Sequence, residues 1–298
     1  MTEARLSGVI AAIATAVDEN GEPDCARSTA LAKFLLDHGC DALNVLGTTG
    51  EATSFSTEQR RKLMSAYREA GLPMQRLMVG TGAAAVRDAV ELTRHAAELG
   101  FAAALLLPPF YYKGVADDGL VAYVEAIVAA TKHRPIPVYL YNFPALSGVP
   151  WHVGLVARIV ASFGNRIAGL KDSSGDLGFA RAAAAVAPGF AVFPSNEAAL
   201  LEARNGPFAG CISATVNLNA DLCARAYRGG DAVALEAAVN IRKLFDGKPL
   251  VSGVKALLAH IHDDPALARV KPPLSALSAS DRTTIVAGYD SVRAKRVA

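Results

Sequence analysis

The sequence has few cysteines and little excess charge of either sign, and each shortage excludes a class of protein. Its 4 cysteines form no Cys-x-x-Cys pair and have no histidine at metal-ligand spacing, so neither a zinc site nor a disulfide framework is indicated. The 30 basic and 28 acidic residues leave a formal net charge of +2, and the basic residues are spread evenly along the chain. This balance argues against nucleic acid or an acidic membrane surface as a partner, so a small molecule is the expected ligand.

Long hydrophobic runs are absent as well. No apolar stretch reaches the roughly 18 residues that span a bilayer, and the N-terminal MTEARLSGVI lacks the features of a secretory signal. A cytoplasmic protein without a membrane partner is therefore expected. Hydrophobic residues nevertheless make up 52% of the 298 residues and charged residues only 19%, a composition that favours a large buried core over disorder.

What the sequence does contain is a regular alternation of short apolar runs and amphipathic segments. The runs are mostly apolar throughout, as expected of strands in a parallel sheet that is covered on both faces. Eight of them lie in residues 9–17, 42–46, 76–82, 102–112, 136–144, 167–171, 190–197 and 210–217. Eight strand-helix units predict an α/β fold, a closed (β/α)8 TIM barrel of about 250 residues. The alternative is a doubly wound open sheet, but no Gly-x-Gly-x-x-Gly follows the first strand.

The barrel is expected to occupy residues 1–228. A short step between the last two strands predicts a brief seventh helix at about residues 198–203. After Gly229 the pattern gives three helical segments, roughly 231–245, 251–261 and 280–294, and no further strand. Residues 229–298 are therefore predicted to form a C-terminal helical extension within the same structural unit, because no flexible linker separates them from the barrel.

One apolar run ends abruptly in a lysine. The stretch IAGLKDSSGD places Lys171 where a buried strand leaves the core. Desolvation there disfavours the ammonium form and leaves a neutral amine, which can attack a ketone and form an imine. Lys171 is thus the candidate nucleophile. The ordinary alternative is that Lys171 simply opens a solvated loop, as most lysines do.

In a barrel, the carboxyl ends of all strands lie on one face, so the polar residues that close the strands are expected to meet there. They are Thr48 and Thr49, Tyr111 and Tyr112, Tyr141 and Asn142, Lys171 and Asp172, Ser195 to Glu197, and Ser213 and Thr215. The threonines and the backbone N–H groups around Gly47 could hold a carboxylate, and Tyr141 could transfer protons beside Lys171. Each also has a structural interpretation, since threonines form turns and strand tyrosines pack in cores.

With these residues in place, the sequence resembles the dihydrodipicolinate synthase and N-acetylneuraminate lyase family of class I aldolases over nearly its whole length. The resemblance lies in three motifs in order: GTTGE at residues 47–51, YNFPALSG at 141–148 and GLKDSSGD at 169–176. It implies a (β/α)8 barrel in which Lys171 forms a Schiff base with pyruvate or a pyruvate-derived 2-keto acid. No cofactor is implied besides this covalent imine.

The resemblance also assigns roles at the strand ends. It implies that Tyr141 is the proton shuttle and that Thr48 and Thr49 supply the carboxylate-binding and relay hydroxyls. A tyrosine from a neighbouring subunit completes the family's site and matches Tyr111 or Tyr112, of which we place Tyr111 in the catalytic set. Gly47, the backbone around Ile212 and Ser213, and the rim residue Ser195 are the expected substrate-binding positions. A homo-oligomer, a dimer or a tetramer, is implied.

One departure bears on the substrate. Dihydrodipicolinate synthases carry an arginine after the Tyr-Asn-x-Pro motif that binds a second carboxylate, and Leu146 stands at that position here. Leucine cannot ionise or donate a hydrogen bond. The expected function is therefore a lyase acting on pyruvate or a 2-keto-3-deoxy sugar acid. The alternatives are a 4-hydroxy-tetrahydrodipicolinate synthase, an N-acetylneuraminate lyase, a keto-sugar-acid dehydratase and, from another class, a non-catalytic metabolite-binding protein.

Overall fold

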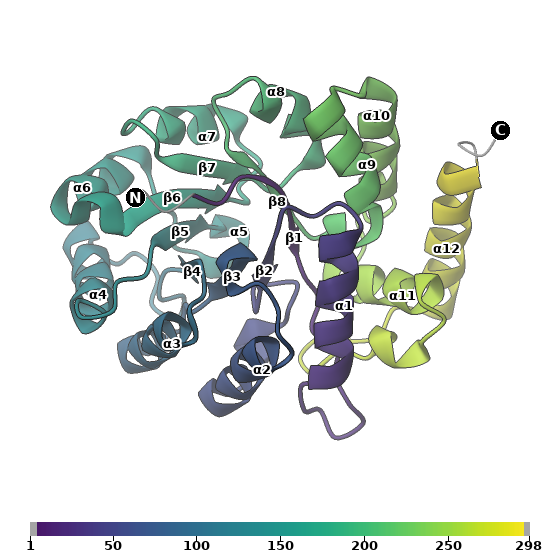
Figure 1. Ribbon diagram of the computed structural model, residues 1–298, viewed down its shortest axis with the longest axis horizontal. Coiled ribbons are helices and arrows are strands. Elements are labelled where there is room, and N and C mark those ends of the chain that lie inside the picture. Colours follow the sequence, from purple (N-terminus) through teal and green to yellow (C-terminus); the bar gives the residue numbers. More distant parts are fainter. Residues whose placement is uncertain (1–4, 295–298) are drawn as a thin grey trace.

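Eight parallel strands form the centre of the computed structural model, which describes residues 5–294 (Figure 1). The outermost residues of the two predicted units, 1–4 and 295–298, lie outside this range. The strands are β1 (Gly8–Ala12), β2 (Ala42–Val45), β3 (Leu77–Gly80), β4 (Ala103–Leu106), β5 (Val138–Asn142), β6 (Ile167–Asp172), β7 (Ala191–Pro194) and β8 (Gly210–Ser213). Every residue of every strand is buried, which explains why the strands read as continuous apolar runs.

The strands are paired in the order β7-β6-β5-β4-β3-β2-β1-β8, so each strand lies beside its neighbours in sequence and β8 returns to β1. Between β7 and β8 the backbone N–H of Ala209 donates to the carbonyl of Val192 at 2.9 Å. The sheet is therefore a nearly closed barrel, and the predicted (β/α)8 fold is confirmed.

Twelve α-helices lie within residues 5–294, and the longer ones surround the barrel (Figure 1). They are α1 (Cys25–Asp37), α2 (Thr57–Glu69), α3 (Val86–Leu99), α4 (Asp117–Ala130), α5 (Pro144–Ser147), α6 (Val153–Phe163), α7 (Leu177–Ala184), α8 (Leu200–Arg204), α9 (Val216–Gly229), α10 (Ala232–Lys243), α11 (Leu250–Ile261) and α12 (Ala279–Ala294). None of these helices combines the length and the apolar character that crossing a membrane requires, within the part of the chain that the structure describes.

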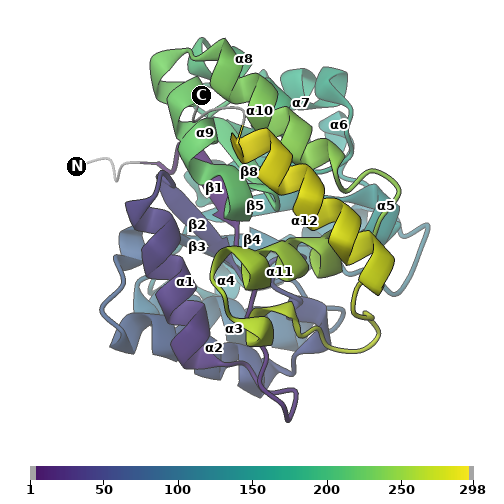
Figure 2. The same ribbon diagram turned by 90° about the vertical axis from the view of Figure 1, so that its right-hand side faces the viewer.

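The C-terminal helices α10, α11 and α12 pack against the barrel rather than standing apart. Figure 2 shows α11 and α12 on the side of the barrel that also carries α1 and α9. Ile241, Leu257 and Tyr289 of these helices share one hydrophobic cluster with Leu35 and Cys223 of the barrel helices. The Tyr289 hydroxyl also donates to the Leu218 carbonyl at 3.2 Å. The barrel and the extension thus bury apolar surface against each other.

Several predicted boundaries are wrong because apolar composition does not mark where a strand ends. The first strand stops at Ala12 instead of reaching residue 17, although Ile13 and Ala16 beyond it remain buried in the outer core. The fourth strand ends at Leu106 rather than at residue 112, since Pro108 and Pro109 have no N–H to continue the ladder. The short helix α5 was not predicted at all, and the brief seventh helix consists of a 3-10 turn followed by α8.

Candidate active site

Lys171 and Tyr141 lie side by side at the carboxyl end of the barrel. They are partners in the parallel register of β5 and β6, and both are buried, at 2% and 4% exposure. The Lys171 Nζ lies 4.3 Å from the centroid of the Tyr141 ring. Tyr141 and Phe193, the two register partners of Lys171, belong to the apolar cluster inside the barrel. The lysine therefore places its amine inside the barrel, against an aromatic face, and not in a solvated loop.

The Tyr141 hydroxyl connects three strand ends. It is 3.2 Å from the Thr48 Oγ1, and it accepts a hydrogen bond from the Ser173 Oγ at 3.4 Å. Thr48 follows β2, Tyr141 is the penultimate residue of β5, and Ser173 follows β6. The chain of hydroxyls exists only because parallel strands bring their carboxyl ends together. Hydroxyls in such a series can both donate and accept, which suits them to passing a proton. The sequence did not single out Ser173.

A tight turn at residues 47–50 presents Thr48 to this group. Its residues at either side, Leu46 and Glu51, have left-handed backbone conformations with φ of 51° and 54°, which is unusual outside glycine. A Cβ on Gly50 would lie 3.1 Å from the Ile13 carbonyl oxygen and from the Leu46 nitrogen, so a side chain would strain this close approach. The turn is thus held in one shape by its surroundings.

A small cavity opens beside the turn and reaches Tyr141. Its lining comes from the loops after β2, β3 and β4, from the ends of β3, β4 and β5 and from α2: Leu46, Gly47, Thr48, Ala52, Thr53, Arg60, Gly80, Gly82, Leu105, Leu107 and Tyr141. Lys171 is not among these residues and lies behind Tyr141. Arg60 is buried here and donates to the carbonyls of Gly80 and Gly82, at 2.8 and 3.2 Å. Burial lowers the pKa of its guanidinium to about 10. The cavity therefore carries a positive charge at its edge.

Residues behind Tyr141 and Lys171 fix the ends of β5 and β6. The Asn142 amide donates to the Asp172 carboxylate at 2.8 Å, and the Ser174 hydroxyl donates to the same carboxylate at 2.8 Å. Burial raises the pKa of Asp172, and these hydrogen bonds oppose the rise. The fully buried Trp151 donates from its indole to the Tyr141 carbonyl at 3.0 Å. These contacts position the two strand ends without touching the cavity.

The remaining sequence-predicted residues are placed differently. Ile212 is buried inside the barrel, and the buried Ser213 donates its hydroxyl to the Glu197 carboxylate at 2.9 Å. The half-buried Ser195 donates its backbone N–H to the Asp172 carbonyl at 2.9 Å. Thr49 is buried in the turn, whereas Leu146 is 62% exposed on α5.

Tyr111 and Tyr112 do not join the Lys171 and Tyr141 group within this chain. The expectation that they close the fourth strand is wrong, because β4 ends at Leu106 and they lie on the loop beyond it. Their side chains are 75% and 73% exposed, and their rings meet edge to face with centroids 5.3 Å apart. No contact with the site therefore favours one of these two tyrosines over the other.

Two buried carboxylates near the strand ends have cationic partners that sequence reasoning did not find. Glu51 pairs with Lys255 of α11, and both side chains are buried. Glu197 pairs with Arg242 of α10 at 3.2 Å. The sequence offers no signal for either pair, because the cations come from the C-terminal helices and the carboxylates from distant barrel loops.

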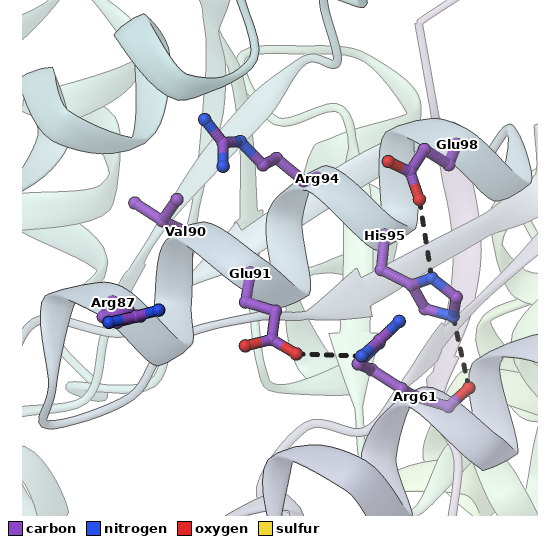
Figure 3. A pocket seen from close by; sticks show the side chains of 7 residues that line it. All are labelled: Arg61, Arg87, Val90, Glu91, Arg94, His95 and Glu98. Atoms are coloured by element: carbon purple, nitrogen blue, oxygen red, sulfur yellow. Dashed lines mark hydrogen bonds and ion pairs between the residues drawn. The ribbon is translucent and has the colours of Figure 1, made fainter.

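A second hollow lies on the outer surface between α2 and α3 (Figure 3). It is lined by Arg61, Arg87, Val90, Glu91, Arg94, His95 and Glu98. The Arg61 guanidinium pairs with the Glu91 carboxylate at 2.9 Å, and both side chains are well exposed. None of the strand-end residues reaches this hollow. The cavity at the carboxyl end of the barrel remains the candidate active site.

The comparison with known families agrees with this geometry. The family model described as the dihydrodipicolinate synthetase family matches residues 5–290, nearly the whole chain. The chain belongs to the dihydrodipicolinate synthetase family. The resemblance seen in the sequence motifs is thereby confirmed. This family consists of aldolases and lyases, and the chain is a lyase of the family.

Individual relatives of the dihydrodipicolinate synthetase family match over most of their length. An uncharacterized DapA-like lyase of Chloroflexus aurantiacus is 32% identical over 268 residues, 88% of each chain. The crystal structure of dihydrodipicolinate synthase from Agrobacterium tumefaciens superposes with a TM-score of 0.89 at 29% identity, covering 96% of this chain and 99% of that one. The Escherichia coli protein YagE, solved in complex with pyruvate, gives a TM-score of 0.88 at 25% identity, covering 97% and 99%.

Proposed function

We propose that the protein is a Schiff-base-forming lyase that acts on pyruvate or a 2-keto-3-deoxy sugar acid through Lys171. The observation that carries the proposal is the buried Lys171 amine against the ring of Tyr141, whose hydroxyl contacts the Thr48 hydroxyl. A lysine amine is the nucleophile that imine formation needs, and a neighbouring phenol can exchange protons with the substrate oxygen. The pyruvate complex of YagE supports the same class of ligand.

Imine formation would use both residues. The Lys171 Nζ forms a bond to C2 of the keto acid, and the ketone oxygen takes up two protons and leaves as water. One of these protons comes from the amine, and the other passes from solvent water along the hydroxyls of Thr48 and Ser173 to Tyr141 and on to the oxygen. The product is a protonated imine between Lys171 and C2. The turn at residues 47–50, with Thr49, would hold the carboxylate through its hydroxyls and backbone N–H groups.

The protonated imine then acts as an electron sink. In the cleavage direction, Tyr141 accepts the proton of the C4 hydroxyl, the C3–C4 bond breaks, and its electron pair moves to C3 and the imine as an enamine. An aldehyde leaves. The enamine takes up a proton at C3, and water releases pyruvate and restores the Lys171 amine. The covalent imine supplies this chemistry, so the proposal requires no cofactor.

Leu146 favours a sugar acid over a dicarboxylic partner. It lies on α5, shortly after β5, the strand that carries Tyr141, and its side chain is exposed. A leucine there cannot bind a second carboxylate. The exposed pair Tyr111 and Tyr112 further supports a homo-oligomer, in which one of these rings reaches the site of a second copy of the chain.

A product screen tests the proposal. The protein is incubated with a panel of 2-keto-3-deoxy sugar acids, and the products are separated into pyruvate, formed by cleavage, and a dehydrated keto acid, formed by loss of water. We expect pyruvate release that Lys171→Ala abolishes. A dehydrated product alone would favour the dehydratase. Thermal stabilisation by keto acids without any product would favour a metabolite-binding protein and contradict the proposal.

A further inference from the structure

Asn44 is a buried amide without a partner. It lies on β2 and is fully buried, and neither its Nδ2 nor its Oδ1 has a hydrogen-bond partner within residues 5–294. Buried polar groups that stay unpaired destabilise the folded state, and most side chains of this kind in proteins are paired. An unpaired amide at the centre of a barrel therefore calls for an explanation that the fold alone does not provide.

The Asn44 side chain points into the barrel. Side chains alternate along a strand, and Ala42, on the same face of β2, belongs to the interior cluster that also contains Tyr141. Leu43 and Val45 belong to the outer cluster under the helices. The register partners of Asn44 are Ala12 on β1 and Met78 on β3, whose side chains are apolar. Neither neighbouring strand can satisfy the amide at this level of the barrel.

The Asn44 amide also lies against the turn at residues 47–50. A Cβ on Gly47 would be 2.8 Å from the Asn44 Oδ1, so the amide contacts the turn at its first glycine. Gly47 and Thr48 line the cavity that reaches Tyr141. Rotating the side-chain amide by 180° exchanges its oxygen and nitrogen, so the N–H donors can face Gly47 in place of the oxygen. The Asn44 amide thus lies directly behind Gly47, which lines the cavity.

We propose that Asn44 is a further substrate-binding residue, whose amide N–H donates a hydrogen bond to the carboxylate of the 2-keto acid. The inference rests on the proposed function, which places that carboxylate on the turn of Thr48 and Thr49. A carboxylate has room for about four hydrogen bonds, and those it accepts are stronger than neutral ones. The amide is unpaired in the free chain because its partner arrives with the substrate. The unpaired amide lowers the folding stability of the free protein in favour of substrate binding, a trade-off found at many functional sites.

Asn44→Leu tests the inference, because leucine keeps the length of the side chain and removes the donor. The pyruvate concentration that half-saturates borohydride trapping on Lys171 is expected to rise about tenfold or more. Methyl pyruvate, which lacks the charged carboxylate, should be affected much less. The melting temperature should not fall, since the substitution removes an unpaired polar group from the core. A purely structural role would instead lower the melting temperature and leave the affinity unchanged.

Thr15→Val is the matched control. The Thr15 Oγ1 is also buried and unpaired, but it lies beside Gly50, which does not line the cavity, whereas the Asn44 amide lies beside Gly47, which does. Loss of the Thr15 hydroxyl should leave the pyruvate affinity unchanged. Asn44→Ala serves as a second variant if leucine prevents folding. Unchanged pyruvate affinity in either folded Asn44 variant, with trapping intact in the wild type, overturns the role of Asn44 alone. No trapping in the wild type overturns the proposed function and this inference together.

Discussion

At the scale of single residues, the hydroxyl of Tyr141 decides how protons could reach the imine. It lies between the hydroxyls of Thr48 and Ser173, at 3.2 and 3.4 Å, and its ring lies against the Lys171 amine. Thr48 follows β2, whereas Ser173 and Lys171 both come from the end of β6. A phenol held in this way can donate to a ketone oxygen and then regain a proton from its neighbours, so its loss should affect the chemical step more than binding.

Tyr141→Phe is therefore expected to lower kcat by about 10²- to 10⁴-fold, the usual contribution of a positioned acid-base group, with little change in KM. Steady-state kinetics of pyruvate release measure both constants. Tyr139→Phe is the matched control, because Tyr139 lies on the same face of the same strand, one step deeper in the apolar interior. Equal kcat values for Tyr141→Phe and the wild type would remove Tyr141 from the mechanism.

Leu146 is the residue where substrate preference can be tested separately. Leu146→Arg adds a planar fork of donors at an exposed position, so the change should not disturb folding. We expect kcat/KM for an aldehyde that carries a second carboxylate to rise about tenfold, in the condensation direction with pyruvate. Leu146→Gln, which is polar but uncharged, is the control. If the arginine variant shows no higher kcat/KM for this aldehyde than the glutamine variant, position 146 does not select the second substrate.

At the scale of elements, the C-terminal helices support the turn at residues 47–50. Glu51 directly follows the turn, and its carboxylate accepts from the Lys255 ammonium of α11 and from the backbone N–H of Lys271 at 2.7 Å. Glu51 and Lys255 are both buried, and burial lowers the pKa of Lys255 against the opposing effect of Glu51. The shape of the turn therefore depends on a segment more than 200 residues away in sequence.

Lys255→Met should destabilise the protein by about 3–5 kcal/mol, because it leaves the Glu51 carboxylate buried without a partner. Urea denaturation measures the free energy of unfolding. The double variant Glu51→Gln with Lys255→Met should recover part of that loss, since no buried charge remains unpaired. Lys248→Met removes one partner of the partly exposed pair with Asp281 and should have a much smaller effect. Equal losses in Lys248→Met and Lys255→Met would contradict the supporting role of the buried pair.

The elements also show what the sequence can and cannot predict. The neighbourhood of Lys171 and Tyr141 follows from the sequence, because consecutive strands of a parallel barrel pair and their carboxyl ends share one face. The pairs of Glu51 with Lys255 and of Glu197 with Arg242 do not follow, because they depend on how the C-terminal helices dock. Strand ends are also missed, because buried loop residues such as Ile13 are as apolar as strand residues.

At the scale of the whole molecule, the barrel and the C-terminal extension share one hydrophobic cluster. Side chains of α10, α11 and α12, such as Ile241, Leu257 and Ile285, pack with barrel residues such as Val9 and Leu43. Removing the extension would expose this apolar surface to water, at a cost of roughly 25 cal/mol for each Å². The two parts are therefore expected to unfold together.

A chain that ends at Gly229 should consequently fail to fold or should aggregate, and the full-length protein should unfold in a single transition. Differential scanning calorimetry tests the second expectation, through agreement of the calorimetric and van't Hoff enthalpies. Circular dichroism and size-exclusion chromatography of the truncated chain test the first. A folded, monodisperse barrel without the extension, or two separate transitions in the full chain, would show that the parts are independent.

The most direct test of the central claim is reduction with borohydride in the presence of pyruvate, followed by peptide mass mapping. If the buried amine of Lys171 forms an imine with a keto acid, reduction fixes the pyruvate-derived group permanently on that residue. We predict a single adduct on the peptide that contains Lys171, dependent on pyruvate and absent from Lys171→Ala. An unmodified Lys171 in a folded protein at saturating pyruvate, or an adduct on another lysine, would contradict the account.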